Sequence, residues 1–400
     1  MNRDDHTNGE PLRILVPEGH PMTRRNFISL AAAASAGVLA FDGIAGAAAN
    51  PLKLLQSAAT KSMKQAGKTT KNLYLYTWGQ YDNPTTFTAW KNATGFAVQI
   101  GSYDSNPAMI AKLELAKGTA GYDIVVPTGG YIPEMVAKGL LLPLDHSKIP
   151  NLKGVDPGLL NFPWDKGNKY SVPKDFGTTG FVYDTTVIKK NLVSWQDFAD
   201  AAKLPQVSGR VSLLDDPDDV LGIPLWIEGV DWNTLDTGKL HKAGTWLIKN
   251  LAPHIKALDS YPGATGGLLN GSYVLSEAWN GDARQVIIKD PKRYKWVVPT
   301  PMTEIWVDTW AVAKGAKNFN TAHAFINYVL DPNVSANEME YTGYNTAVAN
   351  VKSYLPKNTP ATDVIFLTAQ QRKRMVAYIV NASQQLRTQL YANFKAATAS

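Results

Sequence analysis

Tryptophan and acidic side chains stand close together at several points of the sequence, a combination suited to holding an organic cation. Trp279 precedes Asp282, Trp306 precedes Asp308, and Trp78 lies in a third aromatic and polar stretch. Carboxylates can pair with the ammonium ends of such a cation, while indole rings attract its charge and cover its methylene groups, each worth about 0.8 kcal/mol on burial. The alternative is that each tryptophan is an ordinary core residue.

A run of four aspartates follows an apolar segment in Leu213-Leu214-Asp215-Asp216-Pro217-Asp218-Asp219. So many neighbouring carboxylates need a counter-charge to stay ionised together. A calcium loop would carry a glycine and a bidentate glutamate at set positions, and the proline and the missing glycine spoil that pattern. A second interpretation is helix capping, with Asp216 as the N-cap and Asp219 in the first turn. Capping and ligand binding remain compatible, because different acids can serve each role.

Other chemistries find little support in the sequence. It contains no cysteine, which excludes disulfides, thiolate metal sites, cysteine nucleophiles and a lipid-bearing cysteine. The six histidines show no metal-ligand spacing, and neither a GxSxG motif nor a phosphate-binding loop is present. We therefore expect no enzyme activity, no metal and no cofactor. The net charge is +6, but the basic residues form no block, so nucleic acid is not expected as a partner.

The N-terminal region is typical of an export signal. The paired arginines of Thr23-Arg24-Arg25-Asn26-Phe27-Ile28-Ser29 precede an apolar run, residues 30–41, that is too short to span a bilayer. We interpret residues 1–49 as a cleaved twin-arginine signal together with upstream residues, and we attribute the first 21 residues, before Met22, to the choice of an upstream start codon. We therefore expect a periplasmic protein. The alternative is an amphipathic helix of the mature fold. Residues 50–71 are expected to form a solvated tether or an amphipathic helix.

The remaining chain alternates strand and helix patterns. Strands are predicted at residues 73–76, 97–100, 122–126, 181–183, 211–214, 274–275 and 296–298. Helices are predicted at residues 84–92, opened by Asn83, and at 106–117, 320–330 and 368–391. Such alternation builds parallel βαβ units, which bind ligands at the carboxyl ends of their strands.

As an ordered set, the motifs resemble the periplasmic spermidine/putrescine-binding proteins of ABC importers, over nearly all of residues 72–400. The segments that carry the resemblance are Tyr76-Thr77-Trp78-Gly79-Gln80-Tyr81, Ser102-Tyr103-Asp104-Ser105-Asn106, Met109-Ile110-Ala111-Lys112-Leu113, Tyr122-Asp123-Ile124-Val125-Val126-Pro127, Trp279-Asn280-Gly281-Asp282, Trp306-Val307-Asp308, residues 311–330, and Gly343-Tyr344. The resemblance implies an α/β fold of the two-lobe, type II-like periplasmic binding protein class, with a ligand cleft between lobes joined by crossing hinge strands. It also implies a monomer that captures a polyamine and delivers it to an ABC transporter permease.

Carried over position by position, the resemblance implies ten ligand-binding residues. They are Trp78, Tyr81, Thr128, Asp216, Asp219, Trp279, Asp282, Trp306, Asp308 and Tyr344. The aromatic residues would line the methylene chain and the acids would pair with the amines, with further polar contacts from the backbone near Gly130.

Three departures from the family pattern bear on the ligand. Gln80 stands where an acid is common, Gly129-Gly130 replaces bulkier residues, and Asp219 replaces a longer glutamate. They leave open a diamine, a modified amine or a solute outside the polyamines, with Glu277 and Glu304 as acids that could compensate.

We expect a first lobe of residues 72–180 and 309–352 and a second of residues 181–308 and 353–400, so that the chain crosses three times. A binding protein of the same fold for a sugar, an amino acid derivative or a phosphonate is one alternative, although an anion site would favour arginine and helix N-termini. An exported hydrolase would need a nucleophile and a base that the sequence lacks. A sensor that partners a receptor instead of a permease is a third alternative.

Overall fold

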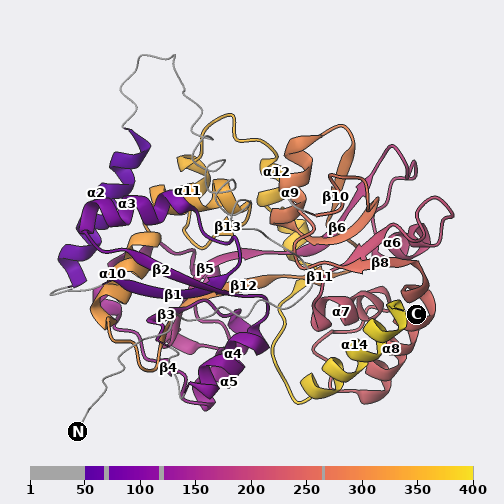
Figure 1. The fold of residues 1–400 in the computed structure, drawn as a ribbon, viewed down its shortest axis with the longest axis horizontal. Coiled ribbons are helices and arrows are strands. Elements are labelled where there is room, and N and C mark those ends of the chain that lie inside the picture. Colours follow the sequence, from indigo (N-terminus) through magenta and orange to yellow (C-terminus); the bar gives the residue numbers. More distant parts are fainter. Residues whose placement is uncertain (1–49, 67–71, 117–120, 264–265, 400) are drawn as a thin grey trace, which may run out of the picture. The chain divides into compact units, whose positions relative to one another are not determined.

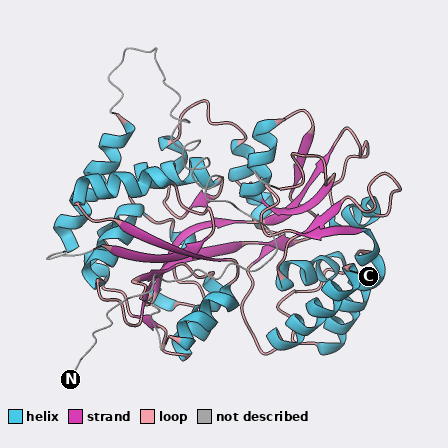
Figure 2. Cartoon of the chain, viewed as in Figure 1, coloured by secondary structure: helices cyan, strands magenta, loops and turns pink. Residues whose placement is uncertain are grey.

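Two separate β-sheets organise the chain, and helices cover both of them (Figures 1 and 2). The computed structural model describes residues 50–66, 72–116, 121–263 and 266–399. The expected export signal, residues 1–49, lies outside the described residues. In the part of the chain that is described, no helix has both the length and the hydropathy needed to cross a bilayer.

The first sheet is mixed, with strand order β13-β5-β12-β3-β1-β2 and with β4 paired to β12. Its strands are β1 (Leu73–Trp78), β2 (Val98–Tyr103), β3 (Ile124–Val125), β4 (Leu141–Leu142), β5 (Ser171–Gly177), β12 (Trp306–Ala313) and β13 (Asn345–Thr346). β1 runs parallel to β2 and β3, whereas β12 runs antiparallel to β3 and β5. The carboxyl ends of β1, β2 and β3 therefore lie at the same edge as the beginning of β12.

Six longer helices belong with this sheet in the described chain. They are α2 (Pro51–Ala66), α3 (Pro84–Thr94), α4 (Asn106–Leu115), α5 (Ile132–Ala137), α10 (Phe319–Val329) and α11 (Pro332–Thr342). In Figure 1, α2, α3 and α11 lie above the sheet and α4 and α5 below it. Local sequence explains the helix starts: Asn83 caps α3 by accepting a hydrogen bond from the Thr85 amide (3.0 Å), and Ser105 caps α4 in the same way.

The second sheet has the order β10-β6-β9-β7-β8. Its strands are β6 (Thr179–Asp184), β7 (Val211–Leu213), β8 (Ile255–Leu258), β9 (Leu275–Trp279) and β10 (Tyr294–Val297). The helices around it are α6 (Trp195–Ala202), α7 (Pro217–Ile227), α8 (Thr237–Asn250), α9 (Asn280–Lys289), α12 (Thr362–Ile365) and α14 (Gln384–Thr398). Because β7 is parallel to β9, the acidic run after β7 and the start of α9 lie at one edge. Each sheet has its own buried hydrophobic core.

The chain passes between the sheets at short segments. Thr178 alone separates β5 from β6, and β11 (Thr303–Glu304) leads through Ile305 directly into β12. The final return carries β14 (Met375–Val376), which pairs in parallel with β11. The expected lobe boundary between residues 308 and 309 falls inside β12, whose pairing with β5 begins at Trp306.

Short 3₁₀ helices complete the described secondary structure. They are η1 (Gly129–Tyr131), η2 (His146–Lys148), η3 (Pro150–Gly154), η4 (Pro157–Leu159), η5 (Lys166–Asn168), η6 (Ala252–His254) and η7 (Val351–Tyr354).

The sequence-based prediction of one helix over residues 368–391 is wrong. The structure has α13 (Ala369–Arg372), then β14, a loop, and α14 from Gln384. The apolar stretch after Arg374 obtains its backbone hydrogen bonds from other parts of the chain: the Ile305 amide donates to Val376 O (3.3 Å), and Asn233 Nδ2 donates to Ala377 O (2.9 Å). Tertiary pairing thus overrides a helical pattern that contains neither glycine nor proline.

Of the two alternatives left open for residues 50–71, the structure shows a helix over residues 51–66. α2 packs against α3 and α10, and it buries Leu55, Ala58 and Ala59. The narrow apolar stripe is sufficient because two small alanines allow close approach of the neighbouring helices.

Candidate ligand-binding site

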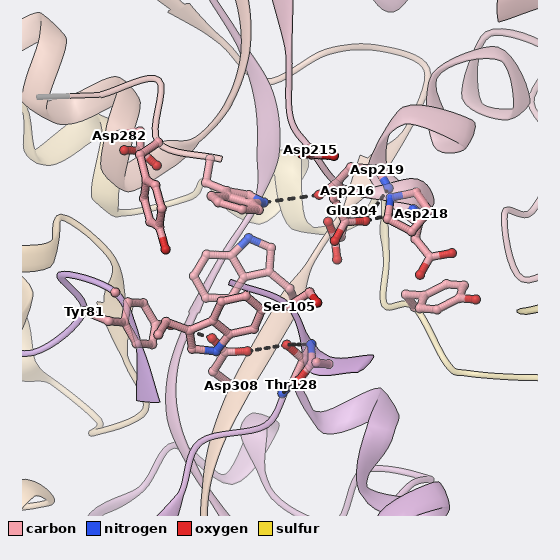
Figure 3. Close-up of a pocket in the computed structure, with 18 of the residues that line it drawn as sticks. Tyr81, Ser105, Thr128, Asp215, Asp216, Asp218, Asp219, Asp282, Glu304 and Asp308 are labelled. Carbon is pink, nitrogen blue, oxygen red and sulfur yellow. Dashed lines mark hydrogen bonds between the residues drawn. The ribbon is translucent and has the colours of Figure 1, made fainter. Parts of the chain in front are cut away.

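One cavity of about 370 Å³ lies between the strand ends of the two sheets, and all ten residues expected from the sequence line it (Figure 3). Elements of the first sheet and their loops supply Trp78, Tyr81, Thr128, Trp306, Asp308 and Tyr344, and the second sheet and its helices supply Asp216, Asp219, Trp279 and Asp282. Seven acidic residues line the cavity, and no Lys, Arg or His of the described chain does. The cavity is therefore suited to a cation.

Strand ends position these side chains. Trp78 is the last residue of β1, and its indole Nε1 donates to Val126 O (3.1 Å), which fixes the ring. Thr128 follows β3 and forms an isolated bridge with Asp308 of β12. Trp279 ends β9, and Asp282 lies in the first turn of α9. The expectation that ligand contacts gather at the carboxyl ends of parallel strands agrees with this placement.

Asp308 is buried and has both carboxyl oxygens engaged by hydroxyl donors. The Thr128 hydroxyl donates to Oδ1 (2.7 Å), and the Tyr81 hydroxyl lies 2.7 Å from Oδ2 and 2.5 Å from Asp175 Oδ1, so Asp308 and Asp175 share its single proton. Behind Tyr81 lies a buried ion pair in which Lys174 Nζ donates to Asp175 Oδ2 (2.8 Å). Burial raises the pKa of Asp308 to about 7, and the Asp175 carboxylate adds to the rise. Because Asp175 takes up the charge of Lys174, Asp308 remains available for a cation.

A second group of acids lies at the start of α7. Asp216 caps the helix by accepting from the amides of Asp218 (2.8 Å) and Asp219 (3.2 Å), so the capping interpretation is confirmed. The Trp279 indole donates to Asp219 Oδ2 (3.2 Å), and Glu304 lies beside Asp219 (Figure 3). Burial raises the pKa of Asp216, Asp219 and Glu304, and their mutual repulsion adds to the rise for Asp216 and Glu304. Among the described residues, Lys395 pairs with Asp215 (2.9 Å), but no Lys, Arg or His forms an ion pair with Asp216, Asp219 or Glu304.

Asp282 forms a third acidic point of the cavity, between the Tyr344 hydroxyl and a close backbone approach at Gly263. Tyr344 Oη donates to Asp282 Oδ2 at 3.5 Å. A methyl group at Gly263 would lie 2.4 Å from Asp282 Oδ1, so no side chain fits at that position. Burial raises the pKa of Asp282 to about 7. The pKa of the Asp282 carboxyl group is thus close to neutral pH, and a bound cation would lower it.

Aromatic rings form the walls between these acids. The rings of Trp306 and Tyr344 pack edge to face with centroids 4.8 Å apart, and Trp78 packs on Tyr103 at the same separation. Trp306 and Tyr344 are each 8% exposed, so their remaining surface faces the cavity. Indole and phenol faces in this position can cover methylene groups and attract a positive charge.

The cavity also contains residues that the sequence did not reveal as lining. They include Asp218, Tyr261 and Tyr378, together with Glu304, which the sequence offered only as an acid that could compensate. Glu304 stands two residues before Trp306, and this short spacing from an expected ligand-binding residue could have identified it as a lining residue. Tyr378 was hidden because its segment has a helical pattern.

The two glycines after Thr128 have a packing role in the structure. A methyl group at Gly129 would lie 2.5 Å from the Trp164 ring, and one at Gly130 would lie 2.4 Å from Tyr378 O. Thr128 and Tyr131 line the cavity, whereas the two glycines between them are not part of its lining. The absence of side chains at Gly129 and Gly130 therefore leaves space for Trp164 and for the segment that carries Tyr378. Glu277 is likewise outside the lining, where its Oε2 accepts from the Leu214 amide (3.0 Å).

Two sheets joined by short crossings, with an acidic and aromatic cavity between their strand ends, define a two-lobe solute-binding protein. The chain belongs to the bacterial extracellular solute-binding protein family, whose model matches residues 85–368.

Its relatives include binding proteins for polyamines. The chain is 33% identical over 315 residues to spermidine/putrescine-binding periplasmic protein 1 of Haemophilus influenzae, covering 78% of this chain and 86% of that protein. It is 34% identical over 278 residues to the spermidine/putrescine-binding periplasmic protein of Escherichia coli, covering 68% and 77%.

Solved structures agree with the fold expected from the sequence. The putative spermidine/putrescine ABC transporter protein of Listeria monocytogenes superposes with a TM-score of 0.75 and 29% identity, over 82% of this chain and 99% of that one. The spermidine/putrescine substrate-binding protein of Streptococcus pneumoniae has a TM-score of 0.69 and 30% identity, over 82% and 100%. The two-lobe α/β periplasmic binding protein fold is thereby confirmed.

Proposed function

We propose that this chain captures a polyamine outside the cytoplasm and delivers it to the permease of an ABC importer. The observation that carries the proposal is the cavity lining, which combines seven acids and several aromatic faces with no basic side chain of the described chain. The names of the relatives supply independent support, since they describe spermidine/putrescine-binding periplasmic proteins. No bond is made or broken in such a function.

The ligand would act by holding two lobes together. The acids at the α7 end and Asp308 at the β12 end belong to different sheets, so a cation with two ammonium groups can bridge them. We assign the two sheets with their helices as the cores of the lobes and the ten cavity residues as ligand contacts. A ligand that touches both lobes only when they are closed stabilises the closed form by its differential affinity.

Export and docking complete the proposal. We infer that the paired arginines at positions 24 and 25 direct the precursor to the twin-arginine pathway and that the mature monomer is periplasmic. The closed form would then dock on the permease subunits. Replacing both arginines by lysine should leave the precursor in the cytoplasm, which fractionation of cells that express the chain would measure. An unchanged distribution would contradict this route.

Titration calorimetry on residues 50–400 at low salt tests the binding function. Putrescine, cadaverine, spermidine and spermine would be titrated in turn, with a linear dicarboxylate of similar length as the anionic control. We expect micromolar or tighter binding of at least one amine and none of the dicarboxylate. Absence of binding by all four amines would reject the polyamine and favour another solute of the same fold.

A further inference from the structure

The acid that lies beside Asp219 in the cavity belongs to the hinge (Figure 3). Glu304 is the last residue of β11, two positions before Trp306, at the segment where the chain returns to the first sheet. Its backbone carbonyl accepts from the Thr178 hydroxyl (2.6 Å), and its side-chain Oε2 accepts from the Thr179 hydroxyl (2.9 Å). Both threonines belong to the other short crossing, so the carboxyl group of Glu304 is fixed to both connections.

Glu304 and Asp219 form a pair of buried carboxyl groups. The two residues are 7% and 4% exposed, and both line the cavity. Asp219 Oδ1 is buried and receives no hydrogen bond from an N–H or hydroxyl donor of the described residues, and the carboxyl group of Glu304 lies beside Asp219 (Figure 3). Two neighbouring buried carboxyl groups repel each other when both are ionised, so such a pair is most stable when one of them keeps a proton.

No counter-charge relieves this pair within the described chain. No described lysine, arginine or histidine forms an ion pair with Asp219 or Glu304. The charged or titratable groups that face them are Asp216, Asp218 and Glu277, and Arg387 acts on Asp218. Burial, followed by the repulsion from Asp219, raises the pKa of Glu304 well above its ordinary range. Without a cation beside it, Glu304 therefore favours its protonated form.

We propose that Glu304 is an ammonium-binding residue that exchanges its proton for the ligand, and that it acts together with Asp219 at the α7 end of the cavity. This inference rests on the proposed function. An incoming ammonium group donates N–H to both carboxyl groups, the proton of Glu304 passes to bulk water, and the charge of the pair changes from −1 to −2. Because Glu304 lies on the hinge, ligand binding at this end also fixes the two crossings.

The variant Glu304→Gln tests the exchange, since an amide keeps the size and the bond from Thr179 but holds no titratable proton. We expect polyamine affinity to fall by about ten- to a hundred-fold, the loss of one charge-assisted hydrogen bond. Calorimetry in buffers of different ionisation enthalpy counts the protons released per ligand, and the variant should release fewer than the wild type. Unchanged affinity or an unchanged proton count would overturn the proposal.

Glu228→Gln is the matched control. Glu228 follows α7, pairs with Lys242 (2.8 Å) outside the cavity, and undergoes the same carboxyl-to-amide change. This variant should bind the polyamine with the affinity of the wild type and release the same number of protons per ligand.

A measurement without ligand separates this inference from the binding function. Infrared spectra of the free protein at neutral pH should contain a protonated-carboxyl band that is weaker in Glu304→Gln and unchanged in Glu228→Gln. Identical spectra would overturn the proposal even if polyamines bind. A third outcome is that the wild type binds no polyamine while the band is still weaker in Glu304→Gln. That outcome would reject the proton exchange with a ligand and the polyamine function, and only the carboxyl pair would remain.

Discussion

Asp308 contacts two hydroxyl groups from the first sheet and forms no ion pair with a residue that the structure describes, which makes it the simplest test of charge in the cavity. Asp308→Asn keeps the size of the side chain and an oxygen that can accept one of these bonds. We expect polyamine affinity to fall by about ten- to a hundred-fold because a charged partner of the ammonium becomes neutral. The temperature of thermal unfolding should change little. Burial already opposes ionisation of the Asp308 carboxyl group, as its raised pKa indicates, and the amide of the variant carries no charge.

Asp363→Asn is the control for that substitution, since Asp363 is exposed on α12 and outside the cavity lining. Calorimetry of the two variants side by side measures the difference. Equal affinities would remove Asp308 from the site.

The raised pKa of Asp282 predicts opposite pH trends for stability and for binding. Burial raises this pKa to about 7, so the folded chain keeps a proton that the unfolded chain loses near pH 4. Stability of the free protein should therefore fall as pH rises from about 4 to about 7. Affinity for a polyamine should rise over the same window, because the ammonium needs the carboxylate and itself stays protonated.

Thermal unfolding of the free protein and calorimetric titration, each at several pH values, measure the two trends. Asp282→Asn should flatten part of both curves. Affinity that is independent of pH in the wild type would contradict the assignment of Asp282 as a ligand contact.

At the residue scale, sequence reasoning succeeded where a motif lies at a strand end. Trp279 and Asp282, like Trp306 and Asp308, keep their short spacing in the sequence, so the resemblance could place each pair and the structure brings them into one cavity. Glu304 was offered only as a possible substitute, because its importance depends on Asp219, a residue 85 positions away that meets it only in the folded chain.

At the scale of elements, the contact between η1 and the segment before α14 predicts a cost for any side chain at Gly130. A methyl group there would lie 2.4 Å from Tyr378 O, a backbone atom that cannot rotate away. Gly130→Ala should lower the free energy of unfolding by about 1–3 kcal/mol and weaken ligand binding, because Tyr378 lines the cavity.

Gly154→Ala is the matched control, since no atom lies within 4 Å of the added methyl group. Chemical denaturation of both variants, followed by titration with the preferred amine, measures the effect. Equal stability would show that the segment carrying Tyr378 moves without cost.

The elements that sequence reasoning predicted well are those whose ends are marked locally. Asn83 and Ser105 cap their helices as N-cap residues do, and both helices begin where predicted. The failure at residues 368–391 has the opposite cause. Its central part pairs with β11 and with Asn233, partners distant in sequence that leave no trace in the local pattern. Non-local pairing decided that segment, and it also placed Tyr378 in the cavity.

At the scale of the molecule, the contact between Tyr261 and Asp104 is one of those that join the two sheets' loops at the cavity, and it predicts how the closed form is held. Tyr261, between β8 and β9, donates its hydroxyl to Asp104 Oδ1 (2.9 Å), just after β2. The approach is close, because a methyl group at Gly79 would lie 2.8 Å from the same hydroxyl. This contact forms only when the lobes are closed, so it should lower the free energy of the closed form and leave that of the open form unchanged.

Tyr261→Phe removes this hydroxyl and keeps the ring in the cavity wall. We expect polyamine affinity to fall by about three- to ten-fold, mainly through faster dissociation, because a partly exposed bond to a carboxylate contributes less than a buried one. Stopped-flow dissociation measures the rate, and Tyr354→Phe, on an exposed tyrosine outside the cavity, is the control. The double variant with Asp104→Asn should dissociate no faster than Tyr261→Phe alone, since both changes break one bond. Additive effects of the two substitutions would show that the bond does not hold the lobes together.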